Sequence, residues 1–227
     1  TAQSILQLGT LTGLLSLLGW LLAGTLGIAF ATGTVLFALW FLPRLSPAIL
    51  MRWHQGRLLR TEELPWLHQI QKDLANRAGF VRSPALYYVP SSALNAFAVG
   101  NRQEGGIAVT DGLLRTLSYR EVRAVLAHEM THLQHNDVSV MLLSSIVGRL
   151  IQWLAWSGIA LILFSLPLSW LYEKPVPWLG LLLMIVAPWL SLLLQARLSR
   201  TREFQADLGA ARLTDDPQAL IQALAKI

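Results

Sequence analysis

The sequence predicts a mainly α-helical membrane protein with several spans and a small antiparallel β-sheet. Hydrophobic residues make up 54% of the 227 residues and charged residues only 14%, whereas soluble domains carry about 25% charged residues. The apolar residues are also gathered into long uncharged runs, which surround one polar stretch with both helical and strand patterns. These features indicate spans with a folded region between them.

The charge and cysteine content narrow the function classes. The formal net charge is +5 and the sequence pI is about 10.1. The basic residues lie beside the apolar runs, so membrane topology explains them better than nucleic-acid binding, and we expect no nucleic-acid partner. The absence of cysteine excludes disulfides, thiolate metal sites and a cysteine nucleophile.

The first apolar run predicts a transmembrane hairpin. No charged residue or histidine occurs from Thr1 to Pro43, although one span needs only about 20 residues. We therefore expect spans at Ile5–Leu22 and Thr25–Leu42, with a turn near Gly24–Gly27. A cleaved signal peptide is not expected, because it would have a basic start and a shorter apolar core.

A second hairpin is expected at Leu150–Tyr172 and Pro175–Ala196. A buried helical hairpin in a soluble core is the alternative, but uncharged runs of this length are rare there. The chain thus divides into a hairpin at 1–43, a polar region at 44–149, a second hairpin at 150–196 and a helical return segment at 197–227. Because the last segment stops within a helical pattern and the first residue is not methionine, we expect a fragment of a longer chain.

Arginines predict the orientation of the hairpins. They follow the first hairpin and flank the second, whereas the turn between the last two spans has one lysine and one glutamate. By the positive-inside rule, the polar region faces the cytoplasm. The arginines concerned are Arg44, Arg52, Arg57, Arg60, Arg149, Arg197, Arg200 and Arg202.

The polar region is expected to be α+β. An apolar stripe predicts a helix that begins at Thr61 and ends before Gly79. Ser118, with Glu121 three residues later, forms a capping-box pattern that predicts the start of a second helix. The expected strands are Leu86–Val89 and a hairpin of Ala96–Val99 with Ile107–Thr110.

The second helix carries the segment His128-Glu129-Met130-Thr131-His132. Residues four apart lie one turn apart on the same helical face, so both imidazoles can bind one zinc ion. Glu129 is rotated by about 100° from His128 and can act as a general base beside the metal. The alternative is a helix with two surface histidines and an ordinary glutamate.

A carboxylate is the best source of a third ligand. Glu203 and Asp207 share a helical face; Glu203 can ligate the metal while Asp207 accepts a hydrogen bond from the far nitrogen of a ligand histidine. The alternative is a solvated acidic pair that balances neighbouring arginines. The apolar hairpin enters and leaves on one side, so both halves of the site share a compartment. His135 is expected next to the ligands or at the surface, with metal ligation as the alternative, and His54 and His68 are expected to have surface or packing roles.

These motifs together resemble the HtpX family of membrane metalloproteases. The resemblance rests on Ala127–His132, Asn136-Asp137 and Ser199–Asp207, and covers most of the chain. It implies a zincin-like catalytic region on the cytoplasmic side of the inner membrane, one Zn²⁺ per chain, and polypeptide substrates that include misfolded membrane proteins. The resemblance also implies a C-terminal region beyond the end of this sequence, so no oxyanion stabiliser is assigned.

The resemblance further implies that Asn95, Ala96, Phe97 and Ala98 form an edge strand beside the site, to which a substrate adds by backbone pairing. A purely structural strand is the alternative. We therefore expect a zinc-dependent endopeptidase. A membrane metal-binding or transport protein and a catalytically silent scaffold are the other hypotheses; the four expected spans contain no ionisable residue, which disfavours transport.

Overall fold

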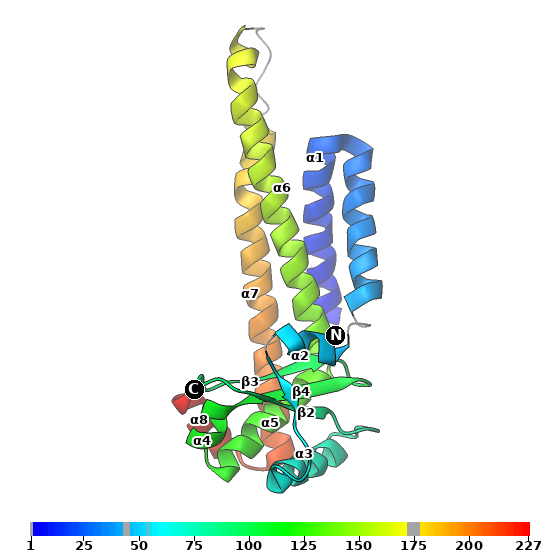
Figure 1. The fold of residues 1–227 in the computed structure, drawn as a ribbon. Coiled ribbons are helices and arrows are strands. Elements are labelled where there is room, and N and C mark those ends of the chain that lie inside the picture. The colour runs from blue at the N-terminus through cyan, green and yellow to red at the C-terminus, as the bar shows by residue number, and fades with distance from the viewer. Residues whose placement is uncertain (1, 43–45, 54, 172–177) are drawn as a thin grey trace. The chain divides into compact units, whose positions relative to one another are not determined.

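The computed structural model describes residues 2–42, 46–53, 55–171 and 178–227. The chain forms two compact units, each built from separate segments. The helical unit contains Thr1–Leu42 and Val140–Arg200, and the α+β unit contains Pro43–Ser139 and Thr201–Ile227. Two long helices, α6 (Asp137–Leu171) and α7 (Trp178–Thr214), have residues in both units (Figure 1).

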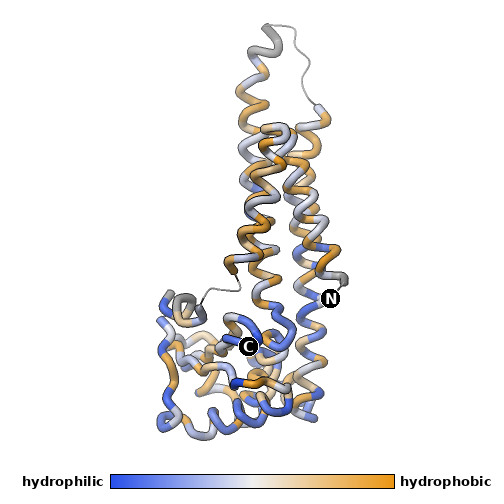
Figure 2. The backbone as a smooth tube through the Cα atoms, turned by 90° about the vertical axis from the view of Figure 1, so that its right-hand side faces the viewer, coloured by the Kyte–Doolittle hydropathy of each residue, from blue (hydrophilic) through white to orange (hydrophobic). Residues whose placement is uncertain are grey.

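The expected fold class is confirmed, because the chain is mostly helical with one small sheet. Among the described residues, three helices are long and apolar enough to span a membrane: Ser4–Phe41, Asp137–Pro167 and Trp178–Thr214. Orange, the colour of hydrophobic residues, predominates along these helices in Figure 2. The second expected hairpin falls on α6 and α7, except for positions 172–177, which lie outside the described residues.

Helix α1 (Ala2–Phe41) reverses direction near its middle and forms two antiparallel arms (Figure 1). Ala23 and Gly24 have non-helical backbone angles, and Gly24 has φ +60°, a conformation that favours glycine. Gly19 and Gly27 lie against each other across the arms, where a Cβ on either would collide with the backbone of the other. The reversal therefore falls where the turn was expected, and two glycines permit the arms to touch.

The helical unit has its own apolar core. Residues at helical spacing on both arms of α1 pack against matching residues of α6 and α7. Large apolar side chains such as Trp20, Phe30 and Phe164 are exposed on the outside of these helices. A bundle that is apolar inside and outside is suited to a lipid environment. The buried core residues include Leu11, Leu15, Leu18, Val35, Val147, Ile151 and Met184.

The sheet of the α+β unit is mixed: two of its strand pairs are antiparallel, as expected, and one is parallel. Strand order is β1-β2-β4-β3, in which β2 (Ala85–Val89) and β4 (Gly105–Thr110) are parallel. The chain passes from β2 to β3 (Ala96–Gly100) at the edge and then turns back into β4, which lies between them. The β3–β4 hairpin was predicted correctly. Strand β1 (Arg57–Leu58) pairs antiparallel with β2 at the other edge.

Helices cover this sheet. Helix α3 (Pro65–Arg77) begins four residues later than expected, because Pro65 occupies its first turn, where proline is favoured. Helix α5 (Tyr119–Gln134) begins after Ser118 as expected, and both hydrogen bonds of the capping box are present. The remaining helices are α2 (Pro47–Trp53), α4 (Asp111–Thr116) and α8 (Pro217–Lys226).

Helix α5 is the centre of the α+β unit. It contacts α3, α8, β3 and β4, and its residues Val122, Leu126 and Met130 are fully buried. An ion pair of 2.7 Å between Lys226 Nζ and Glu121 Oε1 joins α8 to the start of α5. The helix that carries the histidine pair is therefore held by contacts on several sides.

The Gly19–Gly27 contact predicts that Gly27→Ala lowers the stability of the helical unit. The added methyl group meets the backbone of Gly19, so the arms must separate, at a cost of about 1–3 kcal/mol for overpacking. Thermal unfolding in detergent measures the effect. Gly33→Ala on the same helix is the control, because a Cβ there meets no neighbour. Equal midpoints for both variants would contradict the close contact.

Candidate metal centre

Helix α5 positions two imidazoles against each other. His128 and His132 are one turn apart, and their Nε2 atoms lie only 3.2 Å from each other. Both side chains are mostly buried, with exposed fractions of 12% and 10%. The facing nitrogens come from the helix geometry that the sequence spacing predicted.

Helix α7 adds a carboxylate to this pair. Glu203 Oε2 lies 3.3 Å from Nε2 of His128 and 3.8 Å from Nε2 of His132. Small residues on α7 permit this approach, since Ala206 and Ala210 are fully buried and a Cβ on Gly209 would collide with the Thr131 side chain of α5. The structure thus brings together three residues that are up to 75 positions apart (203 − 128).

The geometry of these three residues fits one tetrahedral metal ion. Donor atoms at about 2.0–2.1 Å from a tetrahedral zinc ion are separated by about 3.3–3.4 Å. The two shortest separations, 3.2 Å and 3.3 Å, match this spacing, and all three ligand atoms lie within 4.8 Å of one another. Two imidazole lone pairs that face each other repel unless a cation lies between them. Three protein ligands leave a fourth position open, as in catalytic zinc sites.

His132 is oriented by a buried ion pair that the sequence analysis missed. Its Nδ1 lies 3.1 Å from Oδ2 of Asp137, the first residue of α6. Asp137 is fully buried, and its other oxygen accepts a hydrogen bond from Arg202, which is only 3% exposed. If Nδ1 donates to the carboxylate, the lone pair remains on Nε2, where a metal can bind.

The sequence at the end of α5 contains a feature that indicates the position of Asp137. Asn136 has φ +55°, in the left-handed region that asparagine tolerates, and so ends α5 and lets α6 begin at the next residue. This tight break leaves Asp137 within reach of His132. Arg202 was interpreted as one of the arginines beside the membrane, whereas it is buried in the α+β unit.

Asp207 lies at the far side of the other histidine. Its Oδ1 is 3.0 Å from Nδ1 of His128, although the two atoms are not aligned for an ordinary hydrogen bond. His135 caps the end of α5 and His68 lies on α3; within the described part of the chain, neither joins the cluster of possible ligands. His54 lies outside the described residues.

The site favours positive charge. Burial lowers the pKa of His132, but the carboxylates of Asp137 and Glu203 outweigh it and raise the pKa to about 10 in the metal-free protein. Burial likewise opposes protonation of His128, yet Glu203 and Glu129 raise the pKa of that imidazole above its usual range. A pocket that attracts protons this strongly also attracts a divalent cation, which would displace them.

Glu129 lies next to the edge of the sheet. Burial raises its pKa to about 7, while the backbone N–H of Ala98 on β3 donates a hydrogen bond that favours the charged form. A carboxylate with a pKa near neutrality is suited to general acid–base chemistry. The structure therefore places Glu129 between the histidine pair and β3.

The four residues expected to bind substrate lie at or beside this edge. Asn95 is exposed just before β3, Phe97 packs against a small core that includes Met51 of α2, and Ala96 and Ala98 pack toward the core that contains α5. Asn95 O and Asn101 N bond to the β4 side. By the alternation of an antiparallel pair, the backbone groups of Ala96 and Ala98 face the open edge.

Comparisons with known proteins identify the family of this chain. The profile of peptidase family M48 matches residues 61–227. Among curated proteins, the chain is 36% identical over 220 residues to a protease HtpX homolog of Thermococcus sibiricus, covering 96% of this chain and 75% of the relative. A protease HtpX homolog of Sulfurihydrogenibium sp. is 34% identical over 228 residues, covering 99% and 76%. The chain belongs to the HtpX-type proteases of peptidase family M48.

Membership in family M48 makes the chain a peptidase, and the apolar helices make it a membrane protein. Its substrates are polypeptides and its surroundings include the lipid bilayer. The cluster of His128, His132 and Glu203 suits the metal ion of a metallopeptidase. The family assignment disfavours the alternative hypotheses of a metal transporter and a silent scaffold.

The buried pair predicts two separable effects of changing Asp137. Asp137→Asn leaves Arg202 buried without its carboxylate, which destabilises by about 3–5 kcal/mol, and lowers metal affinity about 10- to 100-fold. Asp137→Asn combined with Arg202→Gln restores part of the stability but not the affinity. Thermal unfolding and zinc titration measure the two quantities. If the single variant matched the wild type in both, Asp137 would have neither role.

Proposed function

We propose that this chain is a zinc-dependent endopeptidase in which His128, His132 and Glu203 bind the metal and Glu129 is the general base. The observation that carries the proposal is the pair of Nε2 atoms 3.2 Å apart with a carboxylate oxygen 3.3 Å away. Two imidazole nitrogens and a carboxylate oxygen at these distances can all coordinate one divalent cation. Glu129 lies beside this site, and its pKa of about 7 suits a general base.

Zinc is the metal that these donors suit best. Two imidazoles and one carboxylate in a tetrahedral arrangement with an open position are typical of catalytic zinc in peptidases. When bound, zinc would polarise the scissile carbonyl group and acidify a water molecule, as Lewis acids do in such enzymes. Asp137 and Asp207 support the proposal, because they lie at the far nitrogens of the two imidazoles.

Glu129 would move the protons of the reaction. Its carboxylate accepts the proton of the attacking water and then delivers a proton to the amine that leaves. The hydrogen bond from the Ala98 N–H fixes the carboxylate at the edge of β3. This contact also lies where a substrate strand would pair, which brings the base and the peptide bond into the same place.

The edge of β3 would hold the substrate in an extended conformation. Strand addition supplies backbone hydrogen bonds without regard to sequence, which suits a peptidase that cleaves unfolded segments. Ala96 and Ala98 direct backbone groups to this edge, while Asn95 presents an exposed side chain beside it. We assign these residues, with Phe97 between them, to substrate binding.

The cellular setting is proposed from charge and from the family resemblance. Arginines lie on the segments that flank the apolar helices, which favours a catalytic region on the cytoplasmic side of the inner membrane. A peptidase anchored there and able to take extended chains would act in the quality control of misfolded membrane proteins. Cleavage of such proteins in reconstituted membranes tests this part of the proposal.

Matched variants at Glu129 and Glu203 separate catalysis from metal binding. Glu129→Gln keeps bound zinc and lowers peptide cleavage at least about 100-fold, the contribution of a positioned base. Glu203→Gln loses zinc as well as cleavage, because an amide oxygen is a weaker ligand than a carboxylate. Metal content by mass spectrometry and cleavage of an unfolded substrate, with and without chelator, measure both.

Two outcomes would contradict the assignment. Robust cleavage by Glu129→Gln would remove that residue from the mechanism. Unchanged zinc stoichiometry and affinity in Glu203→Gln would require another third ligand. Glu104→Gln, an exposed glutamate in the turn between β3 and β4, is the control for loss of charge alone.

If a substrate pairs with β3 as an added strand, cleavage should require a free N–H at every second amide of the substrate. N-methylation of a peptide amide that pairs with β3 lowers kcat/KM about tenfold or more, the effect of losing one hydrogen bond of about 1.4 kcal/mol. Methylation of the adjacent amide has little effect, because alternate amides point away. A series of singly methylated peptides measures the pattern. Equal sensitivity at consecutive positions would exclude pairing with the β3 edge.

A further inference from the structure

Residues of helices α6 and α7 line a cavity in the helical unit that the proposed chemistry does not use. Its volume is about 730 Å³, within the range of about 300–1,000 Å³ typical of ligand sites. Gly148 and Gly158 on α6 allow α7 to approach closely, since a Cβ there would collide with Gln195 and Met184 of α7 respectively. Ten residues of helix separate the two glycines, a length of about 15 Å.

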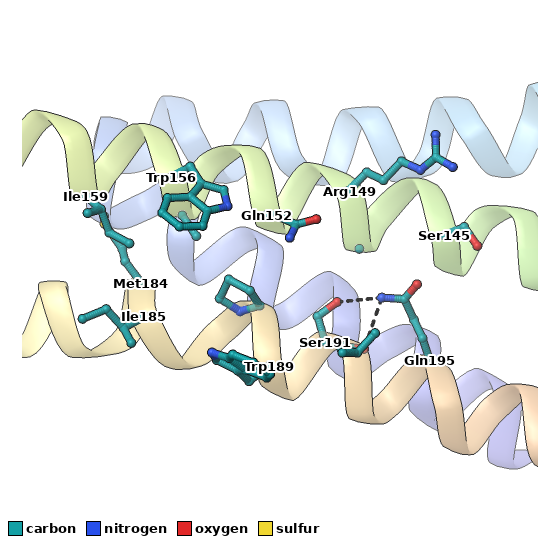
Figure 3. A pocket seen from close by; sticks show the side chains of 14 residues that line it. Ser145, Arg149, Gln152, Trp156, Ile159, Met184, Ile185, Trp189, Ser191 and Gln195 are labelled. Atoms are coloured by element: carbon teal, nitrogen blue, oxygen red, sulfur yellow. Dashed lines mark hydrogen bonds between the residues drawn. The ribbon is translucent and has the colours of Figure 1, made fainter.

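The two ends of the cavity differ in polarity, as Figure 3 shows. Ile159, Met184 and Ile185 line one end, while Ser145, Arg149 and Gln195 line the other. The amide of Gln195 donates hydrogen bonds of 3.2 Å to Ser191 O and 3.0 Å to Ser191 Oγ. The cavity is therefore amphipathic along its length, and it suits a ligand with one polar and one apolar end.

The polar end continues into a second cavity of about 270 Å³. The two cavities share Ser145 and Gln195, and the second adds Ser144 and Ser199. Ser144 is only 3% exposed, and its hydroxyl has no hydrogen-bond partner within the described part of the chain. A buried hydroxyl without a partner is unfavourable, so an acceptor supplied by a ligand would stabilise it.

The charge of the polar end indicates an anion. Among the described residues, no carboxylate pairs with Arg149. Arginine beside an apolar span is costly unless it meets an anion or water, and its guanidinium matches a phosphate group well. On α6, the uncharged run begins just after Arg149, so this end lies where a lipid headgroup would be expected.

We propose that the cavity between α6 and α7 binds one anionic phospholipid. The phosphate pairs with Arg149 and accepts hydrogen bonds from the serines and Gln152 of the polar end, and an acyl chain lies along Trp156 and Met184. The other conceivable occupant is a transmembrane helix of another protein. Arg149, with which no carboxylate of the described residues pairs, and the hydroxyl donors favour the phospholipid, because its phosphate supplies both a negative charge and several acceptors at the headgroup level.

Lipid retention tests this proposal without relying on protease activity. The full chain is reconstituted in phosphatidylcholine nanodiscs with increasing phosphatidylglycerol, extracted in mild detergent and analysed for bound lipid by mass spectrometry. The wild type should retain one phosphatidylglycerol even when that lipid is a minor component. Arg149→Gln should reduce this preference at least about fivefold, as expected for the loss of a charge-assisted contact, and Arg149→Lys should keep part of it.

Matched controls address charge and volume separately. Arg200→Gln removes an exposed arginine of α7 that lines neither cavity, and should leave lipid retention unchanged. Ile185→Trp fills the apolar end and should reduce retention, whereas Leu182→Trp, at an exposed position of α7 outside the cavity, should not. Variants are compared only when the midpoints of their thermal unfolding match that of the wild type. If Arg149→Gln fails to fold, the loss of preference is measured in Arg149→Lys.

Three results would overturn the proposal. The first is equal retention of phosphatidylcholine and phosphatidylglycerol by the wild type. The second is an equal loss in Arg149→Gln and Arg200→Gln, which would indicate general attraction to anionic membranes. The third is displacement of all bound lipid by an uncharged transmembrane peptide that then remains bound, which would assign the cavity to a helix.

Discussion

Asp137 is a fully buried carboxylate, and the candidate site depends on how its charge is satisfied. A buried charge is costly unless it is paired and hydrogen-bonded. Its partners are His132 on α5 and Arg202 on α7, while Asp137 itself begins α6. Satisfying one carboxylate therefore requires three helices to meet. Because Glu203 follows Arg202 directly, the same meeting brings the third candidate ligand to the histidines.

The features that could be predicted from the sequence depend on short-range geometry or on composition. His128 and His132 face each other because they are one helical turn apart, and Ser118 begins α5 because its side chain and that of Glu121 satisfy the first turn. Uncharged runs likewise indicate spans through composition alone. In each case the necessary information lies within a few neighbouring residues or in the average composition of a long segment. Tertiary contacts are not needed.

The features that were missed depend on contacts between distant residues. The pairing of Asp137 with Arg202 joins residues 65 positions apart, and neither residue type shows from sequence alone that it will be buried. The parallel pairing of β2 with β4 depends on β3 passing to the edge, a choice that strand patterns do not contain. The start of α3 was misplaced by four residues for a local reason, because Pro65 is favoured in the first turn of a helix and α3 begins there.

Two small residues of β3 allow the sheet to lie close to Glu129. Ala96 and Ala98 pack toward the core that contains α5, and larger side chains there would hold the helix away from β3. The close packing allows the Ala98 N–H to reach Glu129. A substrate strand on this edge would have to share or replace that hydrogen bond, so substrate binding there would be coupled to the charge state of Glu129. In the proposed function, the same edge would both orient Glu129 and limit the registers in which a peptide could pair.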